Sequence, residues 1–151
     1  MIICDRTTCE RADIIKTINN GFTTIVNVIY SDNSFYLVEN KTPTEKVDIE
    51  FLQNAFIIVC CFNIEAFYRL NPLNTVHCFS YDFNDFTTTN KKYTITHLNK
   101  ISSECYYANN DFIKDLILII PDNVIRADIP FNVHGIITNY PTQVNDRYNF
   151  V

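Results

Sequence analysis

The sequence predicts an α+β fold in which two helices of the N-terminal half pack on a mainly antiparallel sheet. Two observations predict this class. Capping-box patterns, in which a threonine is followed three residues later by glutamate, start two segments within the first fifty residues. From Thr75 onward, apolar and polar residues mostly alternate, as in strands with one buried face. The second half is therefore expected to be β-rich.

The chain has 151 residues, which is enough for one domain with a hydrophobic core of its own. Hydrophobic residues make up 47% and charged residues 19%, a composition typical of globular rather than disordered proteins. We expect residues 1–140 to form a single globular α+β domain. Residues 141–151 are polar with scattered aromatics, and we expect them to lie on the surface as a C-terminal tail.

Both expected helices begin at a capping box. Thr7 and Glu10 precede isoleucines at helical spacing, which predicts a helix over residues 8–19. The stretch Thr42–Glu45 has the same pattern with a proline at the first helical position, which predicts a second helix over about 43–54.

A β-hairpin is expected between these helices. Residues 22–30 are rich in β-branched and aromatic side chains, which favour strands. The sequence SDNS at 31–34 is typical of a turn, because Asp and Asn hydrogen-bond their own backbone there. Residues 35–40 then form the returning strand.

The apolar run at 55–62 allows two interpretations. The adjacent β-branched residues Ile57, Ile58 and Val59 favour a buried strand, followed by a short helix at 63–70. The lack of Gly or Pro before the run favours the middle of one long helix. We favour the strand.

The second half contains four further candidate strands. They are the segments 75–83, 92–98, 111–120 and 131–138, and in the last of them Gly135 suggests a β-bulge.

Two adjacent cysteines, Cys60 and Cys61, raise the question of a thiol site. Neighbours in a strand face opposite sides of the sheet, so this pair cannot hold one metal ion. Free cysteine packs well as a small hydrophobe, and both are expected in the core. Cys4 and Cys9 have the spacing of neither a zinc knuckle nor a redox turn. Cys9, in the first turn of a helix, is the best candidate for a reactive thiol.

The remaining chemistry-bearing residues do not form a recognisable motif. A zinc-stabilised module or a small Cys/His-dependent enzyme would need convergence among His77, Cys78, His97, Cys105 and His134. Their spacing indicates no such site, and we keep it as the alternative hypothesis. No catalytic residue, metal ligand or cofactor is assigned, and with two glycines the chain has no phosphate-binding loop.

Charge and leader composition restrict partner and compartment. The net charge is −5, so nucleic acid is not an expected partner. No apolar run is long enough for membrane insertion, and no signal peptide is recognised. We therefore expect a protein that is not secreted and keeps its cysteines reduced in the cytoplasm or nucleus of a host cell. Abundant Ile, Asn, Phe and Tyr, which have AT-rich codons, fit a large DNA virus, a protist or a bacterium as source, and we favour the virus.

Aromatic residues supply the positive hint about function. Phe79, Tyr81, Phe83 and Phe86 lie in one stretch, and aromatics are enriched at protein interfaces. The competing interpretation is that these strands face the core. The sequence thus predicts a non-enzymatic protein-binding or assembly protein that uses an aromatic-rich β surface. Its partner would be another protein or a second copy of itself, giving a homo-oligomer.

Overall fold

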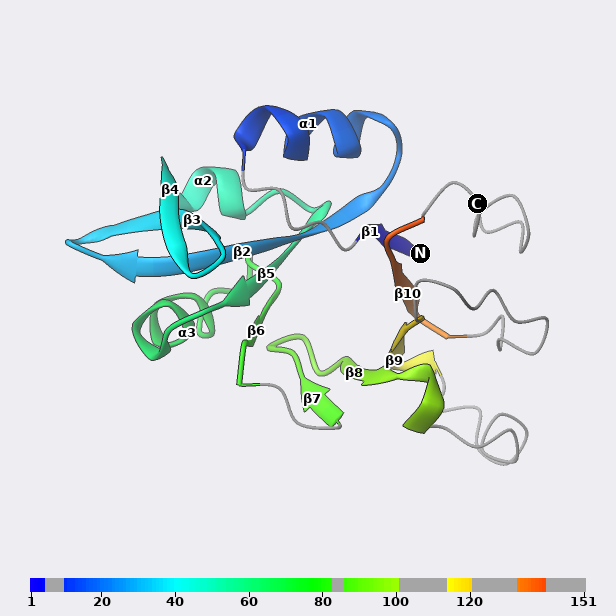
Figure 1. Ribbon diagram of the computed structural model, residues 1–151. Coiled ribbons are helices and arrows are strands. Elements are labelled where there is room, and N and C mark those ends of the chain that lie inside the picture. The colour runs from blue at the N-terminus through cyan, green and yellow to red at the C-terminus, as the bar shows by residue number, and fades with distance from the viewer. Residues whose placement is uncertain (5–9, 83–85, 101–113, 121–132, 141–151) are drawn as a thin grey trace.

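The computed structural model describes residues 1–4, 10–82, 86–100, 114–120 and 133–140 (Figure 1). These residues form three α-helices, one short 3-10 helix and ten strands that belong to one sheet. The predicted mixture of helices with a dominant sheet is confirmed. The described elements after residue 75 are strands apart from the 3-10 helix, as predicted for a β-rich second half.

The elements follow one another along the chain with these bounds. In the first half they are β1 (Ile2–Cys4), α1 (Arg11–Asn19), β2 (Thr23–Ser31), β3 (Ser34–Glu39), β4 (Thr42–Val47), α2 (Ile49–Leu52), β5 (Ile57–Cys61) and α3 (Ile64–Leu70). In the second half they are β6 (Cys78–Ser80), β7 (Phe86–Thr88), β8 (Thr94–His97), η1 (Leu98–Lys100), β9 (Leu116–Ile119) and β10 (Gly135–Thr138).

Most strand pairs of the sheet are parallel. Seven strands form the row β6-β5-β2-β1-β10-β9-β8, in which all six neighbouring pairs are parallel. Only β2–β3, β3–β4 and β7–β8 are antiparallel among the described strands. The prediction of a mainly antiparallel sheet is therefore wrong. Helices α1 and α3 each connect two neighbouring parallel strands, and runs such as IIVCC in β5 are typical of strands buried on both faces.

The row forms a barrel, because the segment between β7 and β8 is hydrogen-bonded to β6 and brings the two ends of the row together. The backbone N–H of Asn90, between β7 and β8, donates a hydrogen bond of 3.0 Å to the carbonyl of Cys78 in β6. The Asn90 side chain accepts from Cys78 N–H at 2.9 Å and donates to the carbonyls of Val76 at 2.7 Å and Asn71 at 3.4 Å. In Figure 1 the seven strands of the row follow one another around a ring in chain order, with β10 beside β1 and with β3 and β4 outside the ring.

Side chains from each of the seven parallel strands fill the barrel interior. This cluster, which we call the barrel interior, contains buried Ile3, Ile25, Ile58, Cys60, Phe79, Ile95, Ile117 and Ile137. The alternate residues of β2, β5 and β6 point outward into a second core cluster, which α1, α2 and α3 cover. Both faces of these strands are therefore buried.

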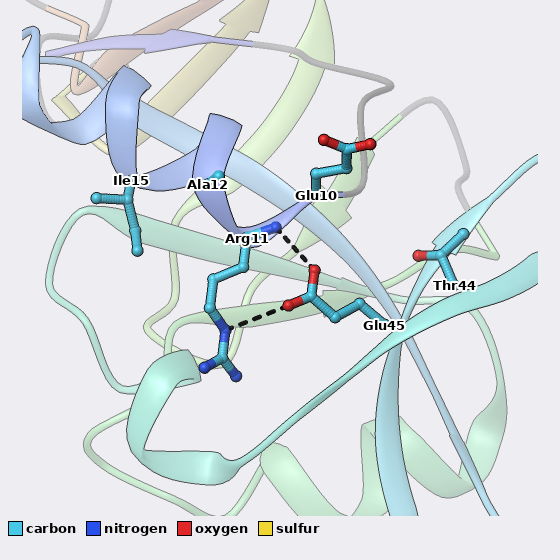
Figure 2. Close-up of a pocket in the computed structure, with 6 residues that line it drawn as sticks. All are labelled: Glu10, Arg11, Ala12, Ile15, Thr44 and Glu45. Carbon is cyan, nitrogen blue, oxygen red and sulfur yellow. Dashed lines mark hydrogen bonds and ion pairs between the residues drawn. The ribbon is translucent and has the colours of Figure 1, made fainter.

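Helix α1 begins later than the capping box predicted. Glu10 is the N-cap residue and makes no side-chain cap bond, so it cannot be the third helical residue that the pattern requires. Thr7 lies outside the described residues, as do positions 8 and 9 of the predicted helix. The carboxylate of Glu45 in β4 instead accepts the N–H of Arg11 at 3.1 Å (Figure 2). The helix ends at Asn19, as predicted, with Gly21 at positive φ just beyond it.

The predicted helix over 43–54 is wrong over most of its length. Asn40 and Lys41 both have positive φ and form a tight turn, after which residues 42–47 pair with β3 as an edge strand. Pro43 is tolerated because an edge strand has one side without hydrogen bonds. The only helical turn is α2, where Asp48 accepts the N–H of Phe51 at 2.9 Å. The threonine–proline pattern therefore marked an edge strand.

Three other predictions for the first half are confirmed. The strands β2 and β3 form an antiparallel hairpin, with Asp32 and Asn33 at positive φ in its turn. The apolar run forms strand β5, and not the middle of a long helix. Helix α3 follows it with Asn63 as its N-cap.

The second-half strands are shorter than the segments predicted for them. Gly135 is paired in register with Ile117, not in a bulge. Glycine at this position lets the N-terminal segment approach β10 closely. A Cβ there would lie 3.1 Å from Ile3 Cδ1 and 3.2 Å from the Met1 carbonyl oxygen. The predicted tail at 141–151 lies outside the described residues. None of the described helices has the length and apolar character needed to cross a lipid bilayer.

Candidate functional site

A hollow of about 550 Å³ lies at the carboxyl ends of the neighbouring strands β5 and β6. In barrels of parallel strands, the loops at this end of the barrel commonly carry the binding residues. The lining residues come from the ends of both strands and the start of α3: Cys61, Phe62, Asn63, Ile64, Ser80, Tyr81 and Asp82. Chain segments far apart in sequence thus meet at this point.

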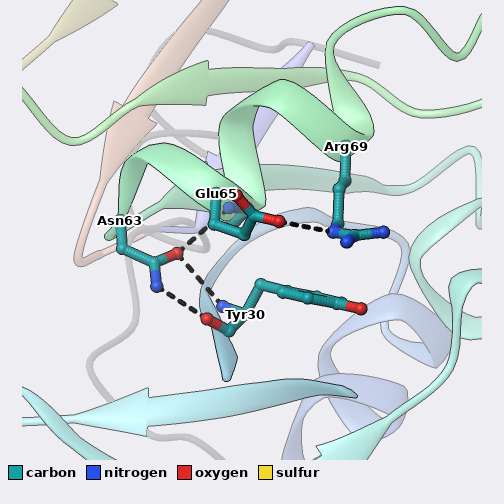
Figure 3. A network of polar contacts seen from close by, with 5 residues as sticks. Tyr30, Asn63, Glu65 and Arg69 are labelled. Atoms are coloured by element: carbon teal, nitrogen blue, oxygen red, sulfur yellow. Dashed lines mark hydrogen bonds and ion pairs between the residues drawn. The ribbon is translucent and has the colours of Figure 1, made fainter. Parts of the chain in front are cut away.

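Asn63 fixes one wall of the hollow (Figure 3). Its Oδ1 accepts the N–H of Ala66 at 3.1 Å and thereby caps α3. The same oxygen accepts the N–H of Tyr30 at 3.1 Å, and Nδ2 donates to the Tyr30 carbonyl at 2.8 Å. One side chain therefore ties the start of α3 to the far end of β2.

Two stacked aromatic rings form another part of the lining. The rings of Phe62 and Tyr81 lie 4.2 Å apart between centroids, with an interplanar angle of 29°. The N–H of Tyr81 donates to the Cys61 carbonyl at 2.9 Å, which extends the β5–β6 pairing past the end of β6. Tyr81 remains 50% exposed, so part of its ring is available to a partner. Asp82 beside it is exposed as well.

The outer side of α3 continues this apolar area. Ile64 is 67% exposed and Tyr68, one turn further on, is 64% exposed. The opposite side of the helix is in the core, where Ala66 and Leu70 are fully buried. We call the exposed area formed by Phe62, Ile64, Tyr68, Tyr81 and Asp82 the Tyr81 surface.

The aromatic residues predicted to bind do not gather on one surface. Phe79 points into the barrel interior and is only 5% exposed. Phe86 is 47% exposed but pairs with Thr96, whereas its neighbour Thr87 pairs with the interior residue Ile95. Paired residues share a face, so Phe86 lies on the outside of the barrel.

Of the predicted set, Tyr81 is thus the residue that lies at the hollow, while Phe83 falls outside the described residues. Sequence reasoning missed Ile64 and Tyr68. The segment NIEAFYRL carries apolar residues nearly all round the helix, and the signal for exposure was their position opposite Ala66 and Leu70.

The described cysteines are buried and face different cores. Cys60 points into the barrel interior, and Cys61 points outward beneath α3, as predicted for neighbours in a strand. Cys61 and Cys78 are hydrogen-bonded to each other, and this contact together with burial raises the pKa of the Cys61 thiol. Cys4 is also buried, whereas Cys9 and Cys105 lie outside the described residues.

Two histidines lie at the opposite, amino end of the barrel strands. His77 precedes β6 and His134 precedes β10, and the ring of Tyr93 stacks on His134 at 3.7 Å. Burial, with smaller contributions from Lys91 and His134, lowers the pKa of His77 to about 4. His97 is the last residue of β8, another strand of the barrel. The described residues contain no group of three His, Cys, Asp or Glu side chains that could hold a metal ion.

No protein-family model matches the chain, and neither the curated proteins nor the solved structures contain a match. The interpretation of the Tyr81 surface therefore rests on its own geometry.

Proposed function

We propose that this protein is a non-enzymatic protein-binding module that holds its partner on the Tyr81 surface. The observation that carries the proposal is the exposure of Ile64 and Tyr81, which both line one hollow, together with that of Tyr68, which lies one turn after Ile64 on α3. Exposed apolar groups that adjoin one another are typical of interaction sites, whereas single ones are ordinary. Tyrosine suits such a site because an apolar ring ends in a polar group.

The partner is expected to combine an apolar or aromatic side chain with a basic one. Asp82 lines the hollow, and no described lysine or arginine does. The nearest cation on α3, Arg69, is already paired with Glu65 at 2.9 Å. A lysine or arginine of the partner would therefore meet Asp82 while its apolar neighbour enters the hollow.

A second copy of the chain is the less favoured occupant. Each copy carries a net charge of −5, and two copies joined through the Tyr81 surface would bring both Asp82 carboxylates to the same interface. Like charges placed face to face disfavour association. A basic partner meets no such repulsion.

A peptide-display selection on the purified full chain tests this proposal. We expect enriched peptides to carry an aromatic or aliphatic residue next to Lys or Arg. Their affinity for the double variant Ile64→Ser, Tyr68→Ser should fall at least about tenfold, the equivalent of 1.4 kcal/mol. The variant Phe56→Ser is the matched control, because Phe56 is 51% exposed but lies before β5, at the other end of that strand.

Two outcomes would contradict the proposal. Peptides that bind the double variant as tightly as the parent chain would place the binding surface elsewhere. A concentration-dependent dimer, seen by analytical ultracentrifugation and abolished by the double variant, would show that a second copy is the occupant.

A further inference from the structure

A second hollow, of about 600 Å³, lies at the turn end of the β2–β3 hairpin and involves none of the residues of the Tyr81 surface. It is enclosed by the end of β2, the start of β3, the end of β4, and the residues around the end of α3. Its volume is within the range of small-molecule sites. The side chains that matter for its chemistry are Tyr30, Phe35, Lys46, Val47, Arg69 and Leu73.

The hollow contains two cationic side chains although the chain as a whole is acidic. Lys46 is exposed and makes no hydrogen bond or ion pair with any described residue. Arg69 uses only its Nε, which donates to Glu65 Oε1 at 2.9 Å, so its two terminal amino groups have no partner among the described residues (Figure 3). Those two groups are the donors that form a fork for an incoming anion.

Arg69 is also held in place before any ligand arrives. Its guanidinium carbon lies 4.1 Å from the centroid of the Tyr30 ring. The backbone of Tyr30 is in turn fixed by the two hydrogen bonds from Asn63. A cation that is already oriented loses less conformational entropy on binding, which favours affinity.

Apart from Asn33, Ser34 and Asp48, the rest of the hollow is lined by apolar side chains and the Tyr30 ring. The rings of Tyr30 and Phe35 meet edge to face at 4.9 Å, and Val47 and Leu73 contribute aliphatic surface. Asp48 is the only described carboxylate on the rim, and its Oδ1 is engaged by the N–H of Phe51. Its charge and that of Glu65, which is paired with Arg69, offset much of the positive charge of the two cations, so a ligand with a single negative charge fits better than a dianion.

We infer that this hollow binds a small organic monoanion, a carboxylate carried on an aryl or aliphatic body. The carboxylate lies between Lys46 and the free edge of Arg69. The apolar body lies against Tyr30, Phe35 and Leu73. This inference is independent of the partner proposed for the Tyr81 surface, and either can fail without the other.

Amide NMR titrations of the full chain with matched ligands test the inference. 4-Phenylbutyrate should produce saturable shifts at the amides of Ser34 and Lys46, whereas 4-phenylbutyramide, which lacks the charge, should bind at least about tenfold more weakly. The variant Lys46→Glu should lose affinity for the carboxylate to a similar extent. Lys16→Glu, which changes another exposed lysine, on α1 and outside the hollow, is the control for net charge.

Three results would overturn the inference. Equal binding of the amide would show that the anion is not recognised. Equal effects of Lys46→Glu and Lys16→Glu would show that only net charge matters. Tighter binding of phenyl phosphate than of the carboxylate would contradict the preference for a single negative charge.

Discussion

Replacing Asn63 by alanine should destabilise the protein more than the loss of an ordinary helix cap. The side chain makes three hydrogen bonds, one to the α3 N-terminus and two to the backbone of Tyr30. Loss of an N-cap costs about 1 kcal/mol. Each of the two bonds to Tyr30 contributes about 1 kcal/mol more. The expected decrease in the free energy of unfolding is therefore about 3 kcal/mol.

Urea unfolding followed by circular dichroism measures this change through the transition midpoint. In a thermal melt, the same loss corresponds to a decrease in Tm of roughly 6–12 °C for a chain of this length. Asp48→Ala is the matched control, because Asp48 caps α2 through a single bond to Phe51 N–H and should cost only about 1 kcal/mol. Asn63→Asp keeps the two accepted bonds and loses the donated one, so its cost should be intermediate.

The reasoning fails if Asn63→Ala costs no more than Asp48→Ala. The hydrogen bonds to Tyr30 would then contribute nothing beyond the cap, and the hairpin end would not depend on Asn63. A second refutation would be a stable Asn63→Ala variant in which the amide of Tyr30 remains as protected from hydrogen exchange as in the parent chain.

Three further outcomes are expected. Gly135→Ala should destabilise the protein by about 1–3 kcal/mol and lower Tm by several degrees, because the new Cβ would lie 3.1 Å from the Ile3 side chain. An unchanged thermal melt would contradict the close packing of β1 on β10. Cys60 and Cys61 should resist alkylation in the native state and react only on unfolding, as mass spectrometry of alkylated peptides can show. His77 has a folded-state pKa of about 4, below its unfolded value, so stability should fall as pH decreases from about 6.5 towards 4; His77→Gln should reduce that dependence in pH-resolved urea titrations.

Local patterns predicted several elements of the first half correctly. The β-branched run predicted β5, Asn63 predicted the start of α3, and the Asp-Asn turn predicted the first hairpin. The stretch from Thr42 failed, because threonine and proline suit an edge strand as well as a helix start. Only the pairing with β3 distinguishes the two.

Strand direction and barrel closure could not be predicted in this way. Whether a strand is parallel to its neighbour depends on contacts distant in sequence, such as Ile2 with Ile136. Closure depends on Asn90 reaching Cys78, and the sequence of that segment indicates only a loop. The apolar runs that are typical of strands buried on both faces were present, but they do not show which strands are neighbours.

The candidate site shows the same limit. Alternation along β6 separated Phe79 and Tyr81 from Cys78 correctly, but it did not show that both faces of the strand are buried. In this barrel the inward face of β6 is as fully buried as its outward face. Only residues near the end of the strand are exposed to solvent. Tyr81 is exposed because it lies just beyond the end of β6, whereas Phe79 lies two residues earlier in the interior.

The pairing of β1 with β10 has a consequence for synthesis on the ribosome. Residues 2–4 emerge first, but one side of their strand has no partner until residues 136–138 have followed. Until then the early half of the ring, β1, β2, β5 and β6, presents two open edges with apolar side chains on both faces. Such edges invite pairing with other chains. A nascent or truncated chain lacking β10 should therefore depend on chaperones and aggregate without them, while the completed ring leaves neither of these two edges open.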